Sequence, residues 1–225
     1  DCIDTFHGAG AHGILVSEDW GTQHSLLVDP GTWRTLFGPW MRRLTGAVRD
    51  RGLHMFFHSC GYIYEILPDL LDMGVQVLQL DQPALESLEF LSDRIRGKAC
   101  LYSPVDIQKV MRTGDPDRIR EEARDMLRRF ALREGGLIAK DYPAWDAIGI
   151  RDEWAAAARE VFAWAGGIRH RPTGSPPEIR PDLGELAQGA ERRVLGVGFR
   201  CAEPNGRVRN LVPGSYPMTG RADVL

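Results

Sequence analysis

The sequence predicts an α/β protein with a parallel β-sheet covered by helices. Short apolar runs and helical patterns alternate five times between residues 12 and 165. The strand runs are continuously apolar, as in sheets that are buried on both faces, and polar residues follow each of them. A doubly wound sheet and a (β/α)8 barrel both fit this alternation.

The first strand–helix unit shows the pattern clearly. Residues 12–19 read as a strand that ends in two acids. Asp29 and Pro30 then provide a helix N-cap and a proline at the first helical position. Apolar residues at three- and four-residue spacing from Trp33 to Val48 predict an amphipathic helix that ends before Gly52.

Four more units repeat this organisation. The expected strands are 53–59, 75–81, 98–104 and 135–141, and the expected helices are 63–72, 84–95, 116–133 and 151–165. Five units are too few to close an eight-stranded barrel. We therefore expect residues 1–165 to be an incomplete barrel, the C-terminal part of a larger one.

Residues 166–225 have a different composition. Proline and glycine account for 17 of these 60 residues, and lysine is absent. This composition is typical of poorly ordered sequence, and we expect a poorly ordered extension. A small appended β module, with a strand at 193–199, and a frameshifted gene end are the alternatives.

The bulk composition excludes several classes of protein. A net charge of −3 gives no electrostatic case for binding nucleic acid or an anionic membrane. No apolar run approaches the roughly 20 residues that span a bilayer. Four widely spaced cysteines fit a reducing compartment, so we expect a cytoplasmic protein. The oligomeric state stays open.

The candidate functional residues lie where the predicted strands end. In parallel α/β folds, the chemistry gathers at the carboxyl ends of the strands. A polar cluster after every strand therefore favours an enzyme. The clusters are Glu18 and Asp19, His58 and Cys60, Asp81 and Gln82, Asp106, and Lys140 with Asp141 and Tyr142.

His58 and Cys60 are the strongest metal-ligand candidates. Residues two apart in a strand point to the same face, and an imidazole with a thiolate suits zinc. A catalytic zinc needs three protein ligands, so the pair is incomplete. A buried His and a buried Cys that fall together by chance remain the alternative.

Three segments of the chain resemble the uroporphyrinogen decarboxylase superfamily. They are "ILVSEDWGTQ", "GLHMFFHSCGYIYEILPDLLDMGVQVLQLDQP" and "GGLIAKDYPAWDAIGI", and the resemblance covers about residues 10–165. The superfamily contains heme-pathway decarboxylases and cobamide-dependent methyltransferases, both on (β/α)8 barrels. The resemblance therefore implies a barrel.

The methyltransferase branch resembles this chain more closely. Its zinc is held by an H-x-C pair, matched by His58 and Cys60, and by a cysteine after the last strand. "LIAKDYPAW" has no cysteine, so we expect Asp141 to replace it, with Glu18 as a second candidate. The decarboxylase branch has a histidine after the last strand, and this histidine is also absent here.

The resemblance implies zinc-assisted methyl transfer between a small methyl donor or thiol and a corrinoid carried by a partner protein. A metal-free decarboxylase, such as uroporphyrinogen decarboxylase, and a non-catalytic fragment that needs a missing half-barrel are the alternatives. The expected catalytic residues are Asp19, Lys140 and Asp141; the expected substrate-binding residues are Glu18, Trp20, Asp81, Gln82 and Tyr142; and the expected metal ligands are His58, Cys60 and Asp141.

Overall fold

The structure is a computed structural model that describes residues 2–131, 135–165, 199–202 and 208–211. Its main sheet contains β1 (Gly13–Ser17), β2 (His54–His58), β3 (Val77–Gln79), β4 (Cys100–Ser103) and β5 (Leu137–Ala139). The α-helices are α1 (Cys2–Gly8), α2 (Pro30–Leu36), α3 (Gly38–Asp50), α4 (Leu67–Met73), α5 (Leu88–Ile95), α6 (Pro116–Phe130) and α7 (Asp152–Ala165). Two short 3₁₀ turns are η1 (Met111–Thr113) and η2 (Asp146–Ile148).

The topology of the sheet is that of a barrel. The strand order is β1-β2-β3-β4-β5 and every pair is parallel, so each strand lies beside the next one in the chain. A doubly wound sheet would instead reverse direction at a switch point. The described strands and helices therefore form part of a (β/α)8 barrel, as expected.

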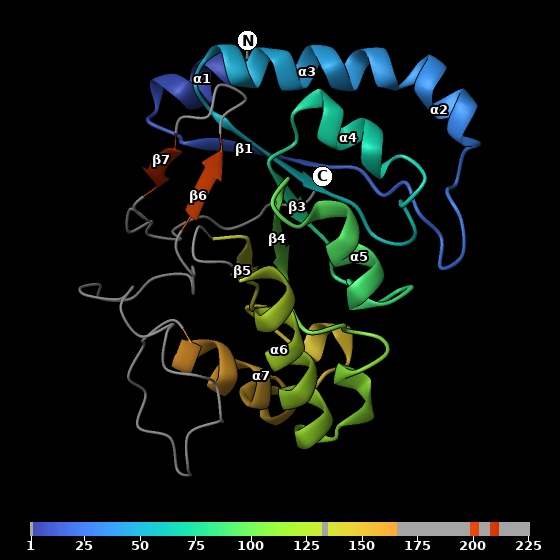
Figure 1. Cartoon of the computed structure of the whole chain (residues 1–225), viewed down its shortest axis with the longest axis vertical. Helices are drawn as coiled ribbons and strands as arrows, with labels where there is room; N and C mark the ends of the chain where they lie inside the picture. Colours follow the sequence, from blue (N-terminus) through green and yellow to red (C-terminus); the bar gives the residue numbers. More distant parts are fainter. Residues whose placement is uncertain (1, 132–134, 166–198, 203–207, 212–225) are drawn as a thin grey trace.

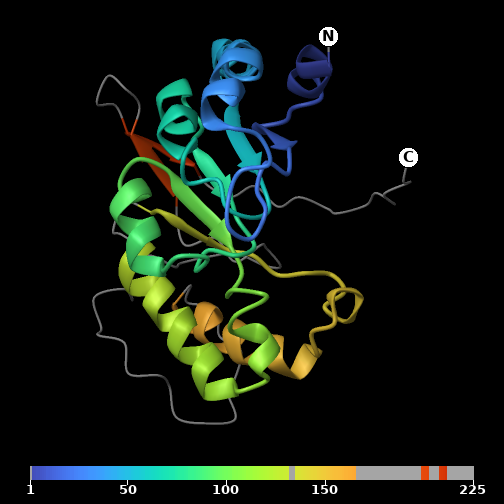
Figure 2. The ribbon, with the colours of Figure 1, turned by 90° about the vertical axis from the view of Figure 1, so that its right-hand side faces the viewer.

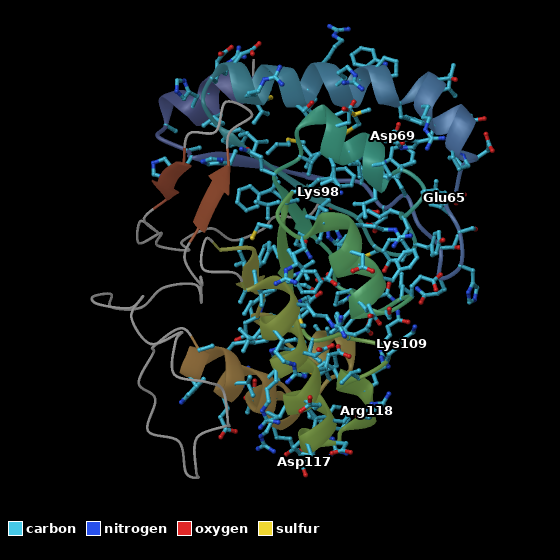
Figure 3. All side chains as sticks on the ribbon, in the orientation of Figure 1. Glu65, Asp69, Lys98, Lys109, Asp117 and Arg118 are labelled. Carbon is cyan, nitrogen blue, oxygen red and sulfur yellow. The ribbon has the colours of Figure 1, made fainter. Side chains whose placement is uncertain are left out.

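The helices form an arc around the sheet: α1, α3 and α2 lie along the top of the view, and α4, α5, α6 and α7 follow below them (Figure 1). The view in Figure 2 shows the twisted strands inside this arc, with α4, α5 and α6 along one side. Ion pairs join neighbouring helices at the surface. For example, Arg34 Nε of α2 donates to both carboxylate oxygens of Asp69 on α4, at 3.1 and 3.0 Å (Figure 3).

The two faces of the sheet have different neighbours. Alternate strand residues, such as Phe57, Leu78 and Leu101, belong to the large core between the sheet and the helices. The opposite face holds a small separate cluster of Val77, Cys100 and Ile138, with Phe56 and Tyr102 against it. Cys100 is buried there.

The helix predicted from residue 30 to Val48 is two helices. Asp29 caps the first, as expected, because its side chain accepts the Thr32 N–H. The break comes at Phe37, between α2 and α3, and Pro39 lies in the first turn of α3. Proline has no N–H to continue the hydrogen-bond ladder of the preceding helix, so a new helix starts.

Two other helices begin later than predicted, each at a start signal. Pro68 lies in the first turn of α4, so this helix starts at Leu67. The side chain of Ser87 caps α5 by accepting the Phe90 N–H, so α5 starts at Leu88. α4 ends at Met73, and Gly74 after it adopts a left-handed conformation with φ 97°.

The C-terminal segment contributes β6 (Phe199–Ala202) and β7 (Val208–Leu211), which pair antiparallel. The predictions for the rest of 166–225, including most of the strand at 193–199, lie outside the described residues. Within the described ranges, no helix has both the length and the hydropathy to cross a bilayer.

Candidate functional site

His58 and Cys60 point to the same side of the chain, as predicted. His58 is the last residue of β2, and its Nε2 lies 3.6 Å from Cys60 Sγ. Ser59, between them, is buried: its hydroxyl accepts the Trp20 N–H at 3.1 Å and donates to the Cys60 carbonyl at 3.0 Å. Ser59 therefore anchors the turn while its two neighbours face the site.

Asp19 completes a three-residue cluster with this pair. Its Oδ1 lies 3.4 Å from His58 Nε2 and accepts the Cys60 N–H at 2.9 Å. One possible ligand atom from each of Asp19, His58 and Cys60 lies within 4.8 Å of the other two. β1 and β2 are paired with Ser17 beside His58, so the loop that follows β1 brings Asp19 to the end of β2.

The imidazole of His58 is oriented for metal binding. Its Nδ1 lies 3.1 Å from the backbone carbonyl oxygen of Gln79, on the neighbouring strand β3. A carbonyl oxygen only accepts, so in a neutral imidazole this contact places the proton on Nδ1 and leaves the Nε2 lone pair facing Asp19 and Cys60. Metal-bound histidines commonly make this kind of outer hydrogen bond.

The environment keeps the Cys60 thiol protonated in the absence of a cation. Burial raises the pKa of Cys60 to about 11, and the negative charges of Asp19 and Asp81 act in the same direction. A thiol must lose its proton to become a metal ligand. A bound divalent cation would supply the positive charge that this loss requires.

A buried ion pair lies beside the cluster. Lys140 Nζ donates to both Asp81 oxygens, at 2.7 and 3.0 Å, and lies 3.3 Å from the Tyr142 hydroxyl. Gln79 Nε2 also donates to Asp81, at 2.7 Å. The charge of Asp81 raises the pKa of Cys60, and the charge of Lys140 lowers it. The ion pair and the metal-ligand candidates therefore belong to one site.

Tyr142 belongs to the same network. Burial and then its hydrogen bond to Asp81 raise the pKa of the Tyr142 phenol, so the hydroxyl remains a proton donor at neutral pH. The Lys140 ammonium also lies 4.3 Å from the centre of the Tyr142 ring. Among the described residues, the carboxylate partner of Lys140 is Asp81.

Asp141 faces a different set of partners. Its Oδ1 accepts from Trp145 Nε1 at 2.6 Å and from the Tyr142 N–H at 3.1 Å, and lies 3.4 Å from Arg159 Nη1 on α7. Among the described residues, the carboxylate grouped with His58 and Cys60 is therefore that of Asp19. Asp141 and Glu18, expected as the third ligand, are not part of this cluster.

The remaining candidates take packing or loop contacts. The Trp20 ring packs on Phe37 and Trp33, with ring centres 4.4 and 6.2 Å apart. Glu18 is exposed, and its N–H donates to the His58 carbonyl. Gln82 is buried and exchanges hydrogen bonds with Gln23. These contacts assign Trp20 to the helix-side core and leave Glu18 at the edge of the site.

Sequence reasoning missed Gln79 and Gln23. Gln79 had a usable signal, because it precedes Asp81 by two residues in a strand and so shares its face. Gln23 had none, because its partner is 59 residues away.

The comparison with protein-family models gives one match. Residues 1–140 match the model described as uroporphyrinogen decarboxylase (URO-D), which is more than half of the chain. Searches of curated proteins and of solved structures found no match.

Proposed function

Since the chain belongs to the uroporphyrinogen decarboxylase family, a family of enzymes, we propose that it carries out zinc-assisted methyl transfer between a small methyl donor or thiol and a corrinoid held by a partner protein. The observation that carries this proposal is the cluster of Asp19, His58 and Cys60. A metal-free decarboxylase has no need for this set of donor atoms.

The donor set fits zinc. Imidazole nitrogen, thiolate sulfur and carboxylate oxygen are all zinc ligands, and three protein ligands with a fourth open position is the catalytic pattern. Bonds of the usual zinc lengths at tetrahedral angles place the ligand atoms about 3.4 to 3.6 Å apart. The 3.4 Å between Asp19 Oδ1 and His58 Nε2 and the 3.6 Å between His58 Nε2 and Cys60 Sγ agree with this geometry.

Zinc at this cluster would supply Lewis acidity, which makes a thiol a better nucleophile or an oxygen or sulfur a better leaving group. Gln79 orients His58 through its carbonyl oxygen. The Asp81 carboxylate is held by Lys140 and Gln79, and we assign to it the acceptance of the proton that a thiol substrate releases. The protonated Tyr142 hydroxyl donates a hydrogen bond to this carboxylate.

Zinc content and a histidine variant test the proposal together. The protein purified without chelator should hold about one zinc per chain, and His58→Ala should lose it because one of three ligands is gone. The rate of methyl transfer from methylcobalamin to a thiol should fall as the zinc is lost. This rate is measured by the absorbance of the demethylated corrinoid. His24→Ala, at an exposed histidine, is the matched control.

Two outcomes would count against the proposal. A protein without zinc whose activity is unchanged in His58→Ala would not be a zinc methyltransferase. Decarboxylation of a polycarboxylate tetrapyrrole by the metal-free protein would favour the decarboxylase alternative, and the absence of either activity in a folded protein would favour the non-catalytic one.

A further inference from the structure

The side chains of Gln23 and Gln82 bond to each other across two loops. Gln82 Nε2 donates to Gln23 Oε1 at 2.9 Å, and Gln23 Nε2 donates to Gln82 Oε1 at 3.4 Å. Gln82 is buried, with 7% of its surface exposed. The amide of Gln82 is thus engaged by the chain itself.

This amide pair crosses the end of β2. Gln23 lies in the loop after β1 and Gln82 follows β3, while β2 lies between these strands in the sheet. His58 ends β2, with Ser17 of β1 on one side and Gln79 of β3 on the other. The pair therefore connects the two loops that flank the candidate metal ligands.

The loop that carries Asp19 is otherwise held from one side. Its other hydrogen bonds to distant described residues go to β2 and the segment after it. They are Glu18 N–H to the His58 carbonyl, Trp20 N–H to Ser59, Cys60 N–H to Asp19, and Tyr62 N–H to the Thr22 carbonyl. The Gly21–Leu26 bridge closes the loop into a small hairpin that includes Gln23. The glutamine pair adds an attachment on the β3 side.

Asp19 needs such support because little packs around it. Its side chain is 61% exposed, whereas that of His58 is 12% exposed. An exposed carboxylate loses rotamer freedom when it becomes a fixed ligand. A loop fixed on both sides of β2 reduces the additional freedom that must be lost.

We propose that Gln23 and Gln82 are positioning residues that hold the Asp19 carboxylate at His58 and Cys60. This inference rests on the proposed metal site. It assigns to Gln82 the role of holding the loop after β1 through Gln23, in place of the substrate contact expected for it.

Binding of Co²⁺ tests the inference without activity measurements. The thiolate-to-cobalt absorption band reports ligation by Cys60, and its titration gives the Kd of the full chain for Co²⁺. Gln23→Ala and Gln82→Ala should each raise this Kd roughly fivefold, the scale of one lost hydrogen bond. The double variant should lose no more than either single one, because the two amides act as one unit.

Leu27→Ala is the matched control, since this residue follows the same hairpin and its side chain is 62% exposed. It should leave the Kd unchanged. The urea midpoint of Gln23→Ala should fall by no more than the loss of a hydrogen bond causes, about 1 kcal/mol, so the protein stays folded during the titration and the rise in Kd reports positioning. An unchanged Kd in Gln23→Ala, with binding intact in the unsubstituted protein, overturns the inference but leaves the metal site standing.

Failure of the unsubstituted protein to bind Co²⁺ would instead contradict the proposed metal site. In that case, NMR measurement of hydrogen exchange at the Cys60 amide tests the positioning role, because this N–H donates to Asp19. Faster exchange in Gln23→Ala supports the role, and unchanged exchange overturns it.

Discussion

Asp19 and Asp141 carry the same carboxylate but differ in their partners. Asp141 accepts from Trp145 and lies beside Arg159, so its charge is already neutralised by a neighbour. Asp19 faces the imidazole of His58 and the amide of Cys60. A cation would therefore gain more from Asp19 than from Asp141.

The first prediction contrasts these two aspartates. Asp19→Asn keeps an acceptor for the Cys60 N–H but removes the charge, so zinc affinity should fall by at least the roughly 10- to 100-fold that an outer partner costs. Asp141→Asn, its isosteric counterpart, should leave zinc affinity within about twofold. A competitive titration with a chromogenic chelator measures both. Equal losses in the two variants would return Asp141 to the ligand set.

The H-x-C pair was predictable from the sequence because period-two alternation decides on which face a strand residue lies. The third ligand was not. Asp19 and Asp141 both follow a strand directly, and only tertiary partners separate them: Trp145 and Arg159 engage one, and the end of β2 receives the other. No local pattern encodes these contacts.

At the scale of elements, two loops meet backbone to backbone next to the site. Gly61 follows Cys60 with φ 75°, and a Cβ on it would overlap the carbonyl groups of Gly21 and Thr22. A Cβ on Gly21 would likewise overlap the backbone of Gly61 and Tyr62. The close approach of these loops sets the separation between Asp19 and Cys60.

The second prediction isolates this contact. Gly61→Ala adds a backbone strain of about 1 kcal/mol and an overlap with the facing loop, so the free energy of unfolding should fall by roughly 2–4 kcal/mol and Co²⁺ affinity should fall with it. Gly52→Ala is the control: its φ of 69° is similar, but a Cβ there meets nothing within 4 Å.

Gly52→Ala should therefore show the backbone strain alone, with Co²⁺ binding unchanged. Urea unfolding and a Co²⁺ titration give both quantities. Equal destabilisation in the two variants would mean that the contact between the loops contributes nothing beyond the conformation of Gly61.

The elements themselves were mostly predictable. All five strands were located, because parallel strands read as continuous apolar runs. The helix over 30–48 was too long because its apolar period continues across the break at Phe37, although Pro39 was a visible signal. The sequential strand order follows from pairing between distant segments. The sequence alone therefore did not decide between a doubly wound sheet and a barrel.

At the scale of the whole molecule, a polar cluster around the buried Asp106 ties the loops after β3 and β4 to α6. Asp106 is fully buried; its Oδ1 accepts the Gln108 and Lys109 N–H groups, and its own N–H donates to Glu122 at 2.8 Å. Lys109 Nζ, labelled in Figure 3, donates to the carbonyls of Ala84 and Leu85. Asp106 therefore caps the turn that follows it, while Asp115 caps α6.

The third prediction concerns the pH dependence that this cluster gives to folding. Burial, and then the charge of Asp106, raise the pKa of Glu122 from 4.5 to about 7. The folded protein thus binds a proton that the unfolded chain releases near pH 4.5. The stabilisation by protonated Glu122 is complete below pH 4.5 and is lost as the pH rises through 7. At about 1.4 kcal/mol for each pH unit of difference, the loss is roughly 3–4 kcal/mol.

Glu122→Gln tests this, because glutamine keeps an acceptor for the Asp106 N–H but has no charge. Urea unfolding should show Glu122→Gln to be more stable than the unsubstituted protein by roughly 3–4 kcal/mol at pH 8, and about equal to it at pH 4.5. Glu121→Gln is the matched control on the same helix. A hydrogen bond from Arg128 lowers the pKa of Glu121 at the surface, so Glu121→Gln should give no such gain at pH 8. An offset between Glu122→Gln and the unsubstituted protein that is the same at both pH values would show that Glu122 acts through packing and not through its proton.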